Sequence, residues 1–369
     1  MKRQLLLPFL QQQSDLPTEI WYSIFTMVEG GERWSLVNAP VVCKLWATII
    51  RRNVCEIGKH HRGSMISDAL FERAPLTRRL YIWNNVERIS SEGLQGLTAL
   101  TSLTVATAKR GRSSLLTGLS NLTHLDCTYT YHLPVHMPKL EHLRLSENKM
   151  ITGDELVNYP RLHTLDVWNC RELSPLFVGR MTGLRSLTFH IQDAMREEST
   201  HFLSHLTSLT SLELVNCNSV SEASIASLTN LTSLDLFFSD AGNRAMTYSF
   251  IERLSSLTKL VIFDRGPRER VGNNRILLPA SLVTLDLHAN YANEIVQFGE
   301  GISHLSNLTY LSTNDAFNLT HSLVTCLPKL VHLQSVGLSA PSSLWHSVKD
   351  RFLTLDCAPV MVISDVRKK

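Results

Sequence analysis

The sequence predicts an α/β solenoid of about 12 repeats preceded by a small helical module, and three observations support this prediction. The pattern Leu-x-x-Leu-x-Leu recurs along the chain from about residue 77. Successive copies start 18 to 26 residues apart. A segment of about 40 residues in front of the array lacks this period and has apolar residues at helical spacing instead.

Each copy of the pattern has two apolar residues two positions apart, so both point to one face of a short strand. One unit cannot bury that face alone, whereas stacked units share a continuous core. We therefore expect a leucine-rich-repeat solenoid, a horseshoe with a concave strand surface, over residues 76–340. The copies start at Thr77, Leu100, Leu122, Leu140, Leu162, Leu184, Leu209, Leu231, Leu257, Leu282, Leu308 and Leu330.

The segment at residues 14–52 predicts a three-helix module. Ile20, Ile24 and Val28 share one helical face, and Val42 and Trp46 begin a second such face. Its order and spacing resemble the F-box family through Leu16, Pro17, Glu19, Ile24, Phe25, Leu36, Val42, Cys43, Lys44 and Trp46.

The resemblance implies a substrate-recognition subunit of a Skp–cullin–F-box type ubiquitin ligase. In that family the module docks on a Skp-type adaptor and, through it, on a cullin, while the repeats hold a target protein. The residues that would contact the adaptor are Leu16, Pro17, Ile20, Ile24, Phe25, Leu36 and Val42.

Residues that alternate with the buried leucines should face the concave side, where we expect a basic or mixed basic–apolar protein segment to bind. Five of the middle strand positions are acidic and one is basic, although the chain carries a net charge of +3. Aromatic residues occupy several of the next outward positions and are enriched in interface hot spots. The predicted substrate-binding residues are Asp126, Asp166, Trp168, Glu213, Asp235, Phe237, Phe263 and Asp286. A purely structural reading stays open, because such aromatic rings can pack on a neighbouring strand.

Composition and motifs narrow the function classes. The net charge is too small to indicate a nucleic-acid partner, and no apolar run reaches the roughly 18 residues of a membrane span. The seven cysteines are odd in number and widely spaced, which favours reduced thiols in the cytoplasm or nucleus. Phosphate-binding loops, nucleophile elbows and zinc clusters are absent from the sequence, so we expect no catalysis, cofactor, metal or homo-oligomer.

The remaining segments complete the expected organisation. Residues 1–13 form a tail, 53–75 a connector and N-terminal cap, and 341–369 a C-terminal cap with a basic tail. Two other functions stay open: a non-catalytic repeat scaffold whose F-box-like helices only cap the array, and a secreted repeat receptor or effector.

Overall fold

The computed structural model describes most of the repeat array. The expected F-box and all its adaptor-contacting residues lie outside the described residues. The chain divides into two compact units, residues 1–140 with 158–160 (unit 1) and residues 141–157 with 161–369 (unit 2). The described residues are 56–57, 66–83, 89–106, 113–129, 132–134, 136–190, 201–217, 220–238, 247–264, 277–289, 302, 304–314, 335–339 and 360–363.

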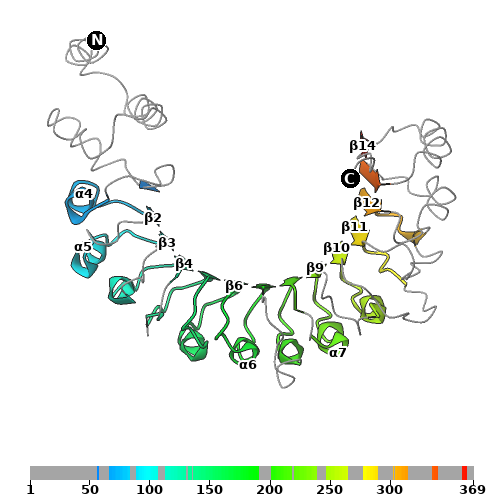
Figure 1. Ribbon diagram of the computed structural model, residues 1–369, viewed down its shortest axis with the longest axis horizontal. Coiled ribbons are helices and arrows are strands. Elements are labelled where there is room, and N and C mark those ends of the chain that lie inside the picture. Colours follow the sequence, from blue (N-terminus) through cyan, green and yellow to red (C-terminus); the bar gives the residue numbers. More distant parts are fainter. Residues whose placement is uncertain are drawn as a thin grey trace, which may run out of the picture. The chain divides into compact units, whose positions relative to one another are not determined.

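Unit 1 contains four parallel strands in chain order, with short helices on their outer side (Figure 1). The strands are β1 (Glu56–Ile57), β2 (Arg79–Trp83), β3 (Ser102–Ala106) and β4 (His124–Thr128). The helices are α4 (Asp68–Arg73), α5 (Ser91–Gln95) and the 3-10 turn η3 (Ser113–Leu116). The Ser90 hydroxyl caps α5 by accepting the Gly93 N–H at 2.9 Å, which satisfies a donor that a helix start otherwise leaves open.

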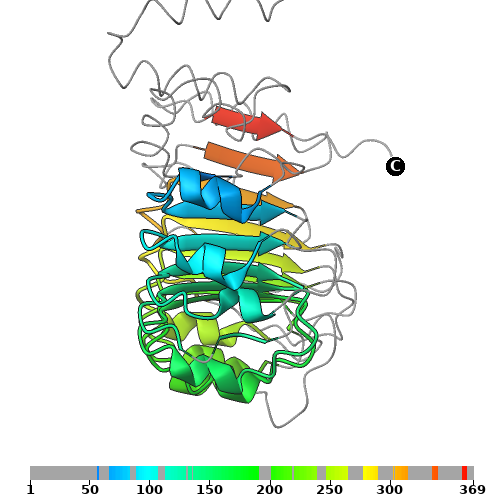
Figure 2. The ribbon, with the colours of Figure 1, turned by 90° about the vertical axis from the view of Figure 1, so that its left-hand side faces the viewer.

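Unit 2 continues the same construction, and its strands also run parallel in chain order (Figure 2). The strands are β5 (His142–Ser146), β6 (Thr164–Trp168), β7 (Ser186–His190), β8 (Ser211–Val215), β9 (Ser233–Phe238), β10 (Lys259–Asp264), β11 (Thr284–Ala289), β12 (Tyr310–Asn314), β13 (Ser335–Ser339) and β14 (Val360–Ile363). The outer side carries α6 (Pro175–Val178), η6 (Phe202–His205), α7 (Glu222–Ala226) and η7 (Ser249–Arg253). One further 3-10 turn, η4 (Asp154–Asn158), spans the division between the units.

The core follows the predicted period. In β6 the side chains of Leu165 and Val167 are fully buried, while Asp166 between them is partly exposed. The same alternation recurs in β7, where Phe189 is fully buried and its ring lies 5.4 Å from that of Phe202 on the outer side. Apolar residues of strand and outer turn therefore share one core, as a solenoid requires.

A left-handed residue follows several strands directly. Tyr129, Glu147, Asn169 and Asn216 have φ between 52° and 59°. In unit 2 each such residue donates its N–H to a carbonyl at the end of the next strand: Glu147 to Trp168 at 2.9 Å, Asn169 to His190 at 3.1 Å and Asn216 to Phe237 at 2.7 Å. This conformation turns the chain away from the strand surface, and asparagine adopts it at lower cost than most residues.

The structure confirms the repeats that start at Thr77 through Leu308 and corrects the last one. In β13 the residue paired with Leu311 is Val336, and Leu338 pairs with Thr313. The final copy therefore starts at Leu333 and not at Leu330. The parallel pattern also extends into the flanking segments, since β1 lies within residues 53–75 and β14 within residues 341–369.

Three of the seven cysteines lie among the described residues. Cys127, Cys170 and Cys217 are buried thiols, and burial raises the pKa of Cys170 to about 11.

Within the part of the chain that the structure describes, no helix has the length and apolar character required to span a bilayer.

Candidate functional site

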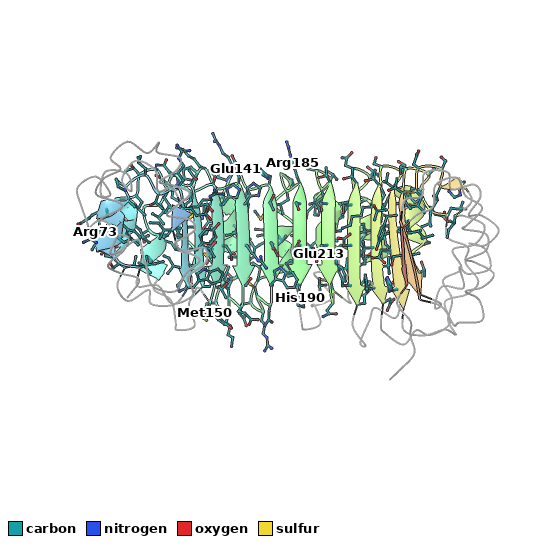
Figure 3. The ribbon with its side chains drawn as sticks, turned by 90° about the horizontal axis from the view of Figure 1, so that it is seen from above. Arg73, Glu141, Met150, Arg185, His190 and Glu213 are labelled. Atoms are coloured by element: carbon teal, nitrogen blue, oxygen red, sulfur yellow. The ribbon has the colours of Figure 1, made fainter. Side chains whose placement is uncertain are left out.

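The solvent-facing side of strands β6 to β11 in unit 2, here called the binding face, consists of two rows of side chains. The strand register aligns the residues of each row. Figure 3 labels one residue of each row, Glu213 and His190. The middle row is Asp166, Thr188, Glu213, Asp235, Val261 and Asp286. The end row is Trp168, His190, Val215, Phe237, Phe263 and His288. Seven of the eight predicted substrate-binding residues lie in these two rows.

The eighth residue, Asp126, belongs to β4 of unit 1, where it pairs in register with Thr104. It is partly exposed, as expected for a position between two buried strand residues. Asp126 therefore lies outside the binding face, which belongs to unit 2.

The end row contains two aromatic groups. Trp168 and His190 meet edge to face with ring centroids 4.9 Å apart. Phe263 stacks between Phe237, at 5.4 Å, and His288, at 4.6 Å, with an interplanar angle of 18° in both pairs. The rings therefore do pack on neighbouring strands, yet they stay partly exposed.

Cations from neighbouring positions offset part of the acidic middle row. Arg144 lies 3.4 Å from Asp166, and the Lys259 ammonium lies 2.6 Å from Asp235. His288 lies 2.6 Å from Asp286 and also contacts the Ser312 hydroxyl at 3.0 Å. Sequence reasoning missed the pairing of Lys259, because Lys259 precedes the middle row by two positions and its contact depends on strand register.

Glu213 is the acid of this row with the least local compensation. Burial raises the pKa of its carboxyl group, and the nearby carboxylates of Asp235 and Asp166 raise it further. The Thr188 hydroxyl, which donates to Glu213 at 3.4 Å, and the more distant Lys259 oppose the rise. Because Lys259 is engaged by Asp235, a cation supplied by a partner would be most favourable at Glu213.

Several polar atoms of the binding face are covered without a hydrogen bond. Among the described residues these include His190 Nδ1 and Asp235 Oδ1. Burial raises the pKa of Asp166, whereas Arg144 and the neighbouring Trp168 indole N–H oppose the rise. Covered polar atoms without partners are costly, so they mark positions where a bound segment or water can supply hydrogen bonds.

A second group of polar side chains lies at the starts of β5 and β6, away from the two rows. Glu141, His142 and His163 bring three possible metal ligands within 4.8 Å of one another. We did not predict a metal site here from the sequence, because the three residues come from two different repeats.

Comparisons with known proteins add little to this description. No protein-family model matches the chain, and no curated protein matches it. Among solved structures, an internalin from Listeria monocytogenes is similar, with 18% identity and a TM-score of 0.45 over 84% of this chain and 87% of the internalin chain. A leucine-rich-repeat protein from Leptospira interrogans is similar with 15% identity and a TM-score of 0.48 over 85% of this chain and 79% of that one. The strand register and the buried leucine period of the chain itself make the described residues a leucine-rich-repeat array.

Proposed function

We propose that the chain is a non-catalytic receptor that binds a basic, partly apolar protein segment on the binding face. The observation that supports this most directly is that two neighbouring acidic residues, Glu213 and Asp235, lie next to the stacked rings of Phe237 and Phe263. An arginine or lysine of a partner can pair with Glu213 while an apolar neighbour covers the rings. Arginine suits this position because its guanidinium binds a carboxylate through two hydrogen bonds and stacks on aromatic faces.

We further propose that this receptor is the substrate-recognition subunit of a Skp–cullin–F-box ubiquitin ligase. The support is the order and spacing of Leu16, Pro17, Ile24 and the other F-box-like residues at 14–52. In such an assembly the repeats position a target while partner chains perform the transfer chemistry, so the receptor acts by raising effective concentration. This role places the protein in the cytoplasm or nucleus, with no nucleic-acid or membrane partner.

The binding face is tested by selecting short random peptides displayed on phage against the full-length chain. We expect the enriched peptides to combine arginine or lysine with aromatic or aliphatic residues, because the face is acidic and aromatic. The same peptides are also tested against the Phe237→Ala, Phe263→Ala double variant, and peptides that bind both chains are discarded. Enrichment of acidic peptides, or equal recovery on both chains, would contradict the proposal.

The ligase role is tested by co-purification with a Skp-type adaptor. We expect the full-length chain to capture the adaptor and the Leu16→Ala, Pro17→Ala double variant to lose it, because truncating apolar anchors removes most of the contact energy. Thermal unfolding of both chains controls for misfolding. Failure of the correctly folded wild-type chain to bind the adaptor would leave a repeat scaffold without a ligase role.

A further inference from the structure

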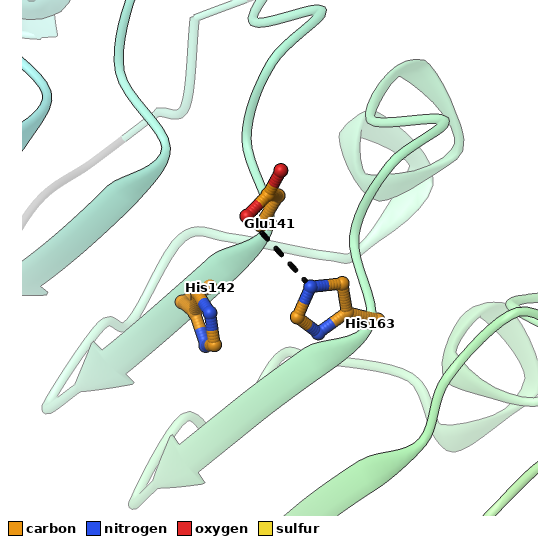
Figure 4. A group of neighbouring side chains, drawn as sticks. All are labelled: Glu141, His142 and His163. Atoms are coloured by element: carbon orange, nitrogen blue, oxygen red, sulfur yellow. Dashed lines mark ion pairs between the residues drawn. The ribbon is translucent and has the colours of Figure 1, made fainter.

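Glu141, His142 and His163 lie together where β5 and β6 begin (Figure 4). The Nε2 atom of His163 is 3.9 Å from the Glu141 carboxylate, and the two imidazole rings meet edge to face with centroids 4.7 Å apart. All three side chains are partly exposed. Two imidazoles and a carboxylate therefore converge on a position that solvent can reach.

The repeat backbone brings the three residues together. Glu141 and His142 fill the two positions between Leu140 and Leu143, and His163 fills the first of the same two positions one repeat later. The Glu141 carbonyl accepts the N–H groups of both His163 and Thr164 at 3.1 Å. This pairing places the side chains of Glu141 and His163 on neighbouring strands, which lie about 4.8 Å apart.

Most other repeats use the first of these positions for a structural hydrogen bond. There a threonine hydroxyl donates to a carbonyl of the preceding repeat at distances of 2.9 to 3.3 Å. The threonines are Thr101, Thr123, Thr210, Thr232, Thr258 and Thr309. Three successive repeats lack this threonine and have Glu141, His163 and Arg185 in its place, and the first two of these are residues that bind metals.

We propose that Glu141, His142 and His163 form a binding site for a zinc-type divalent cation. Two histidines and one carboxylate are a ligand set that Zn²⁺ takes in proteins, with water in the fourth position. Tetrahedral coordination at about 2.0–2.2 Å requires ligand atoms roughly 3.3–3.5 Å apart. The present separations of up to 4.8 Å close to that range by rotation of partly exposed side chains, without movement of the strands.

The surroundings of His163 favour this role. Its Nδ1 atom lies 3.2 Å from the Thr164 hydroxyl oxygen, which leaves Nε2 directed toward Glu141. Histidines that bind metals commonly donate the second ring N–H to such a partner, which fixes the orientation and tautomer of the ring. Thr164 is thus a positioning residue for the proposed site.

The test is isothermal titration calorimetry, in which zinc chloride is added to the full-length chain without an affinity tag. We expect Glu141→Gln, His142→Gln and His163→Gln each to weaken one zinc-binding event at least about tenfold, because each removes one of three protein ligands. Thr164→Val is expected to weaken it by about tenfold, because it removes only the orienting partner of a ligand, whose loss typically costs about 10–100-fold in metal affinity. Visible absorption of bound Co²⁺ reports tetrahedral coordination in the wild-type chain and is expected to be lost in the His163 variant.

His288→Gln is the matched control, since it removes an imidazole that lies 2.6 Å from the Asp286 carboxylate. Within the described residues that pair has no third ligand, so zinc binding should not change. Far-ultraviolet circular dichroism without metal checks that every variant folds. Equal zinc affinity and stoichiometry in the wild-type, Glu141→Gln and His163→Gln chains would overturn the proposal, whether or not the chain binds a protein partner.

Discussion

Replacing Phe237 and Phe263 together by alanine is expected to weaken the binding of a selected basic peptide by on the order of 100-fold or more. The stack of Phe237, Phe263 and His288 is the largest aromatic group of the binding face, and aromatic anchors at interface centres commonly contribute about 2 kcal/mol or more each. The measurement is calorimetric titration of wild-type and variant chains with one peptide. A variant with Met150→Ala and Leu176→Ala removes two exposed apolar side chains elsewhere and should bind as the wild type does.

Pairing of Glu213 with a cationic residue of the peptide is expected to make the peptide affinity depend on pH. Because burial raises the pKa of Glu213, this carboxylate becomes neutral at a higher pH than an ordinary glutamate, whose pKa is about 4.3. The affinity for a cationic peptide should therefore fall as the pH is lowered toward that value, and Glu213→Gln should reduce both the affinity and its pH dependence. An unchanged pH profile in this variant would show that the peptide does not pair with Glu213.

Replacing Phe189 by alanine is expected to lower the free energy of unfolding by about 3–5 kcal/mol. The ring is fully buried and packs against Phe202, so its removal leaves a cavity between the strand and the outer turn of the same repeat. Chemical denaturation monitored by circular dichroism measures the effect.

Ser186→Ala on the same strand is the control for Phe189. Ser186 is partly exposed, and a substitution there should change the free energy of unfolding by no more than about 0.5 kcal/mol. Similar losses for the two variants would mean that the strand as a whole, and not the packing of one ring, determines the result.

The repeat period was enough to predict most strands. Each copy has two leucines three positions apart and an apolar residue two positions later, and in a stacked array these three residues can be buried together only if the last two lie on one face of a strand. The final repeat was placed wrongly because Leu330, Leu333 and Val336 satisfy the pattern in two overlapping registers. Strand β14 was missed because its residues Val360–Ile363 contain no leucine, and no leucine precedes them at the spacing of the repeat pattern.

The candidate site was only partly accessible from the sequence. Alternation placed Asp166, Glu213 and Phe237 correctly on the exposed side of their strands, since strand geometry alone decides which face a residue takes. The pairing of Lys259 with Asp235 and the group formed with His163 depend on contacts between repeats. Alignment of the repeats one beneath another would have shown that position 163 departs from the usual threonine.

The threonine hydroxyls and backbone bonds described above all join residues about one repeat apart, and this spacing has a consequence for how the molecule is made. Contacts of such short sequence separation can form as soon as one further repeat has left the ribosome. Each emerging repeat can pack on the edge strand of the repeat before it. The array can therefore fold one repeat at a time, before the C-terminus has been synthesised. Synthesis rate and folding are then coupled repeat by repeat, and the newest edge is the surface that needs protection from aggregation.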